Sequence, residues 1–261
     1  MAEEHPLKPF YSVLVLAFAC SALVALAAIG LKPYQDANKA LDRKKNILAA
    51  AGLYDPAVNV EKQFASIETR IVSLATGEFV DNQALDPATF DQLGAAMSED
   101  RGRPLAKADD IAGIKRQEAY SLVYLVKDGD RIDQIVLPVR GKGLWSTMYG
   151  YVAVDGNLET IRGVSFYEHG ETPGLGGEIE NPRWQAGWRD KKLYDESGDL
   201  SIAVVKSGTQ SSPEELPYRI DGLSGATLTT KGVDHLMQFW FGDHGFKPFF
   251  EQIRKHGGIH G

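Results

Sequence analysis

The sequence predicts an α+β protein in which one N-terminal transmembrane helix precedes a domain with an antiparallel sheet and flanking helices. Three observations predict this class. A run of uncharged residues near the N-terminus is long enough to cross the bilayer core as a helix. Four segments rich in β-branched and aromatic residues follow as two pairs, each joined by a turn with Asp-Gly. A segment with apolar residues at helical spacing lies near the C-terminus.

The apolar run covers residues 10–31 and contains no charged side chain. As a helix it would span roughly 30 Å, about one bilayer core. A buried core helix of this length would normally show a polar face. A signal peptide with a cleavage site at Ala25-Leu26-Ala27 is the rival interpretation, but the leader is not distinctly basic and the run continues past this point. We expect a cytoplasmic leader over residues 1–9 and an uncleaved anchor over 10–31.

Pro33 should end the membrane helix or kink it. Residues 32–56 carry apolar side chains at helical spacing, which predicts a juxtamembrane helix. A second helix is expected over residues 60–70, at the start of a domain that covers 57–261. The tail at residues 255–261 is rich in histidine and glycine. We expect it to be frayed, with histidines that face solvent rather than bind a metal.

Two β-hairpins are predicted in the middle of the domain. Residues 120–126 and 132–139 flank one turn with Asp-Gly, and residues 146–154 and 158–167 flank the other. Asp-Gly between two apolar runs favours a tight antiparallel connection. The four strands should form an antiparallel sheet with helices packed on it.

Composition and motifs exclude several functions. The formal net charge is −7 without a basic block, which argues against nucleic acid as a partner because backbone binding requires clustered Lys and Arg. The sequence has no Walker, GxGxxG, CxxC or HExxH pattern and nothing like a nucleophile elbow or a metal cluster. We therefore expect neither a catalytic residue nor a metal site. The single cysteine, Cys20, lies in the apolar run and cannot form an intrachain disulfide.

The segment DGLSGAT, residues 221–227, directly precedes a predicted helix. Apolar side chains recur there at helical spacing, at Val233, Leu236, Met237 and Trp240. The free amides and the dipole at the start of a helix favour an anion, especially phosphate. The segment is therefore a candidate site for a phosphorylated ligand.

The side chains of this segment allow two interpretations. Gly225 and Ala226 leave room for a ligand, and Lys231 lies one turn after Thr227 on the same side, where it could pair with a phosphate. Alternatively, Ser224 or Thr227 simply caps the helix. The segment alone does not decide between a ligand site and a cap.

The loop at residues 169–189 is the second candidate region, because it is long and rich in glycine and proline. Glycines such as Gly174 allow a ligand to approach the backbone closely. Trp184 and Trp188 either stack on a flat ligand or pack on the core. Trp145, which precedes the third strand, is a further candidate wall.

The segment 221–227 resembles the flavinylation motif of FMN-binding domains, in which the last threonine carries FMN through a phosphoester bond. The stretch HGETPGLG at residues 169–176 resembles the loop that these domains place beside the flavin. Three further stretches, LKPYQDANKALDRKKNIL, GKGLWSTMYGYVAV and NPRWQAGW, are similar to those of the C subunits of Na+-translocating NADH:quinone reductases. The resemblance covers nearly the whole chain.

The resemblance implies the residues that hold covalent FMN. Thr227 would carry the phosphate, and the residues around it would be Asp221, Ser224, Gly225, Ala226 and Lys231. The isoalloxazine ring would rest against the loop residues Glu171, Thr172, Gly174 and Leu175, with Trp145 as a neighbour.

The resemblance also implies a function, namely a membrane-anchored flavoprotein subunit that relays electrons through FMN in a sodium-pumping NADH:ubiquinone reductase. Its partners would be the other subunits, membrane lipid and, during maturation, a flavin transferase that uses FAD and Mg2+. The chain would then accept the flavin rather than catalyse its own modification. Two alternatives stay open: the G subunit of an Rnf-type ferredoxin:NAD+ complex, and a tethered periplasmic ligand-binding module without redox function.

The charges beside the anchor conflict with the location that the resemblance implies. Five basic side chains follow the apolar run between residues 32 and 45, and only Lys8 precedes it. The positive-inside rule would place the large domain in the cytoplasm, but the rule is weak where a long domain follows the helix. The family places this domain on the periplasmic side of the bacterial inner membrane, and we expect that orientation.

Overall fold

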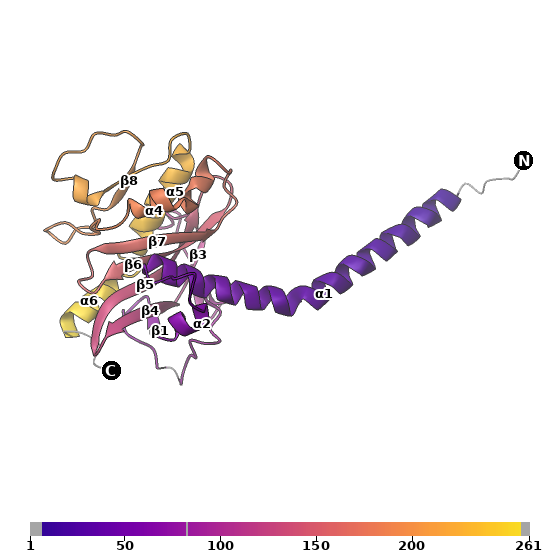
Figure 1. The fold of residues 1–261 in the computed structure, drawn as a ribbon, viewed down its shortest axis with the longest axis horizontal. Coiled ribbons are helices and arrows are strands. Elements are labelled where there is room, and N and C mark those ends of the chain that lie inside the picture. Colours follow the sequence, from indigo (N-terminus) through magenta and orange to yellow (C-terminus); the bar gives the residue numbers. More distant parts are fainter. Residues whose placement is uncertain (1–6, 82, 257–261) are drawn as a thin grey trace, which may run out of the picture. The chain divides into compact units, whose positions relative to one another are not determined.

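The computed structural model describes residues 7–81 and 83–256 (Figure 1). Parts of the expected leader and of the histidine-rich tail, residues 1–6 and 257–261, lie outside the described residues. The chain divides into two compact units, the first ending at Arg43 and the second beginning at Lys44. The second unit therefore begins before residue 57, where the sequence predicts the start of the domain.

The first unit is helical from Lys8 onward and belongs to α1 (Lys8–Ala50). An 18-residue window of this helix has a mean hydropathy of 2.6, and none of the window is buried inside the protein. The core helix of a soluble protein would instead be mostly buried. By length and composition, α1 is therefore suited to be a single membrane anchor.

The helices expected on either side of Pro33 form one continuous helix, because α1 runs through this proline. The separate juxtamembrane helix over residues 32–56 is therefore corrected: the helix ends at Ala50. Gly52 follows with φ +71°, and the amide of Leu53 donates to the carbonyl of Leu48 at 2.8 Å. This geometry terminates a helix and favours glycine, which adopts positive φ without steric strain.

A five-stranded antiparallel sheet forms the centre of the second unit, with the strand order β1-β4-β5-β6-β7. Its strands are β1 (Ile67–Ser73), β4 (Tyr120–Asp128), β5 (Arg131–Lys142), β6 (Thr147–Asp155) and β7 (Ile161–Glu168). β4 pairs with β5, and β6 pairs with β7, so both predicted hairpins are confirmed. Gly129 supplies a positive φ of 61° in the first turn.

The helix predicted over residues 60–70 is wrong in its second half. Helix α2 covers only Val60–Phe64, with the side chain of Asn59 capping it, and β1 starts three residues later. Ile67 and Ile71 lie opposite Val126 and Leu122 of β4. Pairing with a neighbouring strand overrides the local helical pattern, because it buries these isoleucines and completes the hydrogen-bond ladder.

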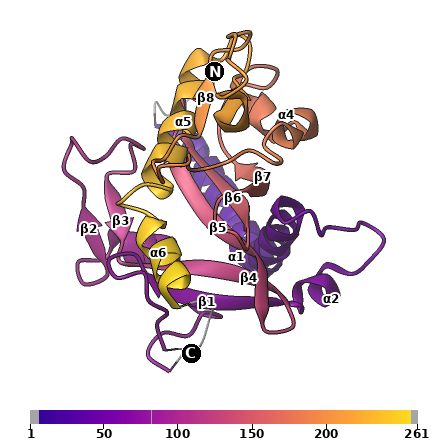
Figure 2. The ribbon, with the colours of Figure 1, turned by 90° about the vertical axis from the view of Figure 1, so that its left-hand side faces the viewer.

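The sheet is buried on both faces, which explains the nearly continuous apolar runs of its central strands. In β5, Ile135 and Leu137 face a core shared with α5 (Thr227–Trp240) and α6 (Lys247–His256). Val136 faces the opposite core, to which the last turns of α1 contribute Ile47 and Leu48. Figure 2 shows the sheet between these two sets of helices.

The remaining elements lie around this central sheet. They are α3 (Gln92–Met97), β2 (Gly102–Pro104), β3 (Arg116–Glu118), the 3-10 helix η1 (Gly176–Glu180), α4 (Pro182–Ala186), β8 (Ala203–Val205), the 3-10 helix η2 (Leu216–Tyr218) and β9 (Arg219–Asp221). β2 pairs with β3, and β8 pairs with β9 in parallel. The β8–β9 pair places the segment after residue 205 beside the segment that precedes α5.

Candidate functional site

Helix α5 begins where the sequence predicts, at Thr227, and its buried face contains all four predicted apolar side chains. Ala226 occupies the N-cap position without a side-chain hydrogen bond to the helix start. The interpretation of Ser224 or Thr227 as a helix cap is therefore wrong. The first amides of α5 consequently keep their capacity to bind an acceptor such as phosphate.

Three threonines near the start of α5 differ in accessibility. Thr227 is exposed, whereas Thr229 and Thr230 are only 1% and 6% exposed. The Thr229 hydroxyl donates to Oε2 of Glu171 at 2.6 Å, and the Thr230 hydroxyl accepts the amide of Leu223 at 3.0 Å. The hydroxyl that remains accessible to a modifying enzyme is that of Thr227.

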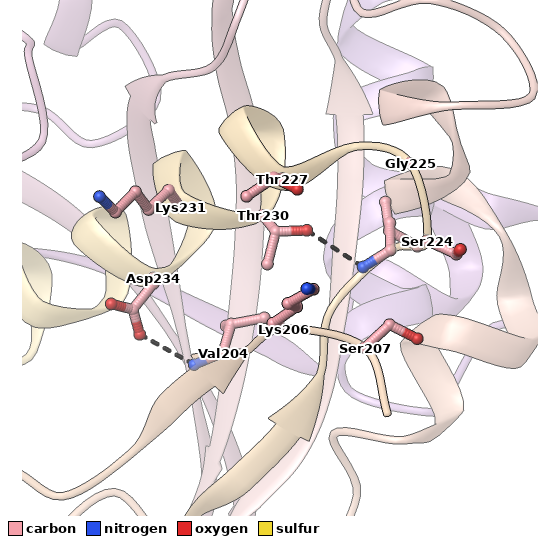
Figure 3. Close-up of a pocket in the computed structure, with 10 residues that line it drawn as sticks. Val204, Lys206, Ser207, Ser224, Gly225, Thr227, Thr230, Lys231 and Asp234 are labelled. Carbon is pink, nitrogen blue, oxygen red and sulfur yellow. Dashed lines mark hydrogen bonds between the residues drawn. The ribbon is translucent and has the colours of Figure 1, made fainter. Parts of the chain in front are cut away.

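A cavity of about 310 Å³ opens at this helix start (Figure 3). Its walls come from β8, the segment after β8, the DGLSGAT segment and the first two turns of α5. The lining residues are Val204, Lys206, Ser207, Leu223, Ser224, Gly225, Thr227, Thr230, Lys231 and Asp234. The structure therefore brings four predicted site residues, Ser224, Gly225, Thr227 and Lys231, to one cavity.

Two lysines and one aspartate set the charge of this cavity. Figure 3 shows the side chain of Lys231 extending away from the Thr227 hydroxyl, whereas Lys206 points into the cavity. The carboxylate of Asp234 accepts the amide of Val204 at 2.8 Å. Sequence analysis missed Lys206, because no motif near it indicates a ligand and its position depends on the pairing of β8 with β9.

The second candidate region, the loop after β7, packs against the start of α5. A Cβ atom built on Gly176 would lie 2.4 Å from Oγ1 of Thr229, and one on Gly225 would lie 3.3 Å from Cδ2 of Leu175. Thr172, Leu175 and Gly174, which has φ +74°, are exposed along this loop. The two regions that the sequence singled out are therefore neighbours in space.

Glu171 differs from the other residues of this loop, because it is only 5% exposed. Oε1 accepts the amides of Trp145 and Ser146 at 2.9 and 3.2 Å, and Oε2 accepts the amide of Leu144 at 3.2 Å as well as the Thr229 hydroxyl. Burial raises the pKa of the Glu171 carboxyl, but these hydrogen bonds outweigh burial and hold the pKa below its ordinary value.

The three tryptophans of the candidate regions, Trp145, Trp184 and Trp188, differ in burial. Trp188 is fully buried, and Trp184 contacts it with ring centroids 5.6 Å apart. The packing alternative is therefore correct for Trp188. Nε1 of Trp184 donates to the backbone carbonyl of Asp221 at 2.7 Å and so supports the DGLSGAT segment from outside the cavity. Trp145 remains 66% exposed and is available to a ligand.

The predicted site residue Asp221 has an exposed side chain and does not line the cavity.

A phosphate and a flat apolar group would bind to different surfaces near the start of α5. The uncapped start of α5, with the ammonium groups of its cavity, suits a phosphate. Large apolar side chains on the three neighbouring segments are exposed, namely Leu144, Trp145, Leu175 and Leu228. Such side chains can cover one face of an aromatic ring system. The residues present thus fit a phosphorylated flavin.

The sequence profile of the FMN-binding domain family matches residues 143–242, from the Trp145 loop to the end of α5. This match identifies an FMN-binding domain within the second unit, and the cavity at the start of α5 lies inside the matched residues.

The Na+-translocating NADH-quinone reductase of Pseudomonas aeruginosa has a C subunit that is 45% identical over 257 residues, which cover 97% of this chain and 98% of the relative. The C subunit of the Yersinia pestis reductase is 46% identical over 253 residues, which cover 95% and 93%. The crystal structure of Shewanella oneidensis NqrC superimposes with a TM-score of 0.75 at 36% identity, covering 84% of this chain and 99% of that structure. The chain belongs to the NqrC family, the C subunits of the Na+-translocating NADH-quinone reductases.

Proposed function

We propose that this chain carries FMN as a phosphoester on Thr227 and relays electrons within a Na+-translocating NADH-quinone reductase. The observation that carries the proposal is the accessible Thr227 hydroxyl at the uncapped start of α5, beside a cavity that contains Lys206. An anion bound there would benefit from the helix dipole and the free amides together. Thr229 and Thr230 are less suitable attachment sites, because both are buried and hydrogen-bonded.

The protein would supply position and electrostatics to the flavin, which would supply the redox chemistry. Ser224, Gly225 and Ala226 would border the phosphate, with Lys206 and Lys231 as the nearby cations. Leu175 and Trp145 would contact the ring, because both are exposed on segments that pack against α5.

A separate flavin transferase would make the phosphoester, because a threonine hydroxyl is a weak nucleophile that requires a base. Thr227 is exposed, so a second protein can reach it. The Thr227 hydroxyl would then accept the FMN moiety of FAD, with AMP as the leaving group. Other subunits of the reductase would donate and accept the electrons.

The attachment is tested with the full-length chain, co-expressed with a flavin transferase and separated on a denaturing gel. Wild-type protein should show ultraviolet-excited flavin fluorescence, and Thr227→Ala should show none. Ser224→Ala is the matched control, since it removes another exposed hydroxyl of the same cavity, and it should stay fluorescent. Full fluorescence of Thr227→Ala would contradict the assignment, and peptide mass mapping would then locate the modified residue.

We also propose that the domain after α1 lies in the periplasm, with the N-terminus in the cytoplasm. The apolar window of α1 supports one membrane crossing, and the long domain that follows weakens the positive-inside rule. Protease added to intact spheroplasts should cleave a chain tagged at its C-terminus. Protection of the tagged domain until lysis would show that the basic residues after the apolar run set the topology instead.

A further inference from the structure

A single carboxylate accepts three backbone amides of the loop before β6. Three consecutive amides, those of Leu144, Trp145 and Ser146, donate to Glu171. Consecutive backbone amides that converge in this way form an anion-binding nest. In this structure the anion is a side chain of the protein itself, which comes from a loop that follows β7.

The same carboxylate is tied to the helix that begins at Thr227. Oε2 of Glu171 accepts the hydroxyl of Thr229, one of the first residues of α5, at 2.6 Å. Both carboxylate oxygens are therefore occupied by donors of the protein, and the side chain is 5% exposed. Glu171 thus has little capacity left to bind a ligand directly, although it lies between all three segments that form the site.

The Glu171 carboxylate lies so close to Gly143 and Gly176 that neither position has space for a side chain. A Cβ atom on Gly143 would lie 2.6 Å from Oε1, and one on Gly176 would lie 3.0 Å from Oε2. Any side chain at these two glycines would displace the carboxylate from its donors. The close packing shows that the three segments are joined at a defined point rather than by loose surface contacts.

We propose that Glu171 is a positioning residue of the flavin site: its carboxylate fixes the backbone of the loop that carries Trp145 and places a fixed negative charge next to the surface proposed for the ring. This inference rests on the proposed function, since it takes the exposed surface beside Thr227 as the flavin platform. A buried anion near the ring opposes the gain of further negative charge, because electrostatic interactions are weakly screened away from water. The fixed charge therefore lowers the midpoint potential of the flavin.

The test uses Glu171→Gln in the full-length chain, with Glu168→Gln as a matched control. Glu168 ends β7 three residues earlier and is exposed, so the control makes the same change of charge without touching the nest. In Glu171→Gln an amide NH2 group replaces one carboxylate oxygen, and this group cannot accept hydrogen bonds from the donors that face it. Amide hydrogen exchange over residues 144–146, measured on protein without flavin, should become faster by on the order of tenfold, as expected for the loss of hydrogen bonds to a charged acceptor.

The second measurement is the flavin midpoint potential of protein produced with a flavin transferase. Glu171→Gln should retain covalent flavin fluorescence and show a more positive potential than Glu168→Gln. Thr229→Val, which removes one donor but keeps the charge, should accelerate exchange with a smaller change of potential. It also provides a second variant should Glu171→Gln fail to fold.

Exchange rates and a potential equal to those of Glu168→Gln would overturn the positioning role of Glu171. Faster exchange with an unchanged potential would overturn the electrostatic part. Retained fluorescence in Thr227→Ala would instead refute the attachment site. The exchange measurement needs no flavin, so the two failures are distinguishable.

Discussion

Gly176→Ala should strongly destabilise the flavin domain, because one methyl group enters the contact between Glu171 and Thr229. The new Cβ atom would lie 2.4 Å from Oγ1 of Thr229 and 3.1 Å from Cβ of Glu171. Both neighbours are buried, so neither can move aside into solvent. Overpacking together with a weakened hydrogen bond to a charged acceptor should lower the free energy of unfolding by about 3 kcal/mol.

Gly174→Ala is the matched control in the same loop. A Cβ atom there meets nothing within 4 Å, but the backbone has φ +74°. The substitution should therefore cost about 1 kcal/mol, from backbone strain alone. The difference between the two variants separates a steric clash from a conformational penalty.

Urea titration of the full-length protein in detergent measures both variants. The four tryptophans, Trp145, Trp184, Trp188 and Trp240, all lie after residue 144, so their fluorescence reports unfolding of the flavin domain and not of α1. With a slope of about 2 kcal/mol per molar, the midpoint should fall by about 1.5 M for Gly176→Ala and by about 0.5 M for Gly174→Ala. A midpoint for Gly176→Ala as high as that of Gly174→Ala would refute the packing argument.

Three further predictions concern charge. Glu118→Gln removes the carboxylate that lies 2.5 Å from the buried Arg140 guanidinium, so it should lower the free energy of unfolding by about 3–5 kcal/mol. Asp243→Asn breaks an exposed ion pair and should lower it by less than about 1 kcal/mol in the same urea titration. Lys206→Ala should slow flavin attachment more than Lys231→Ala in a time course of gel fluorescence, because Lys206 points into the cavity; equal rates would contradict this ranking. Burial raises the pKa of Tyr194 above its ordinary value of 10.0, so the stability that the neutral phenol contributes is complete below that pH and is lost as the pH rises further. Tyr194→Phe should therefore flatten the decline of the urea midpoint above about pH 10. An equally steep decline in this variant would exclude Tyr194 as the source of the decline.

Local pattern and short-range chemistry were sufficient for much of the fold and for proposing a candidate anion site. The two hairpins follow from apolar runs around Asp-Gly, since turn and strands lie within a few residues of each other. The anchor and α5 follow from the spacing and length of apolar residues. Small residues before an amphipathic helix made residues 221–227 a candidate anion site, but only the resemblance to FMN-binding domains singled out Thr227, and its role stays a prediction.

Long-range contacts decided the rest. Ile67 to Arg70 carry a helical pattern and become a strand, because β4 offers a ladder and a buried face. Trp184 and Trp188 could equally have lined a ligand, and the packing of α4 places them elsewhere. Lys206 reaches the cavity through the parallel pairing of β8 with β9. Glu171 is visible in the sequence, but its role depends on donors from residues 144–146 and 229. A hydrogen bond between residues far apart in the chain forms only when the whole core has assembled, so sequence spacing carries no signal of it.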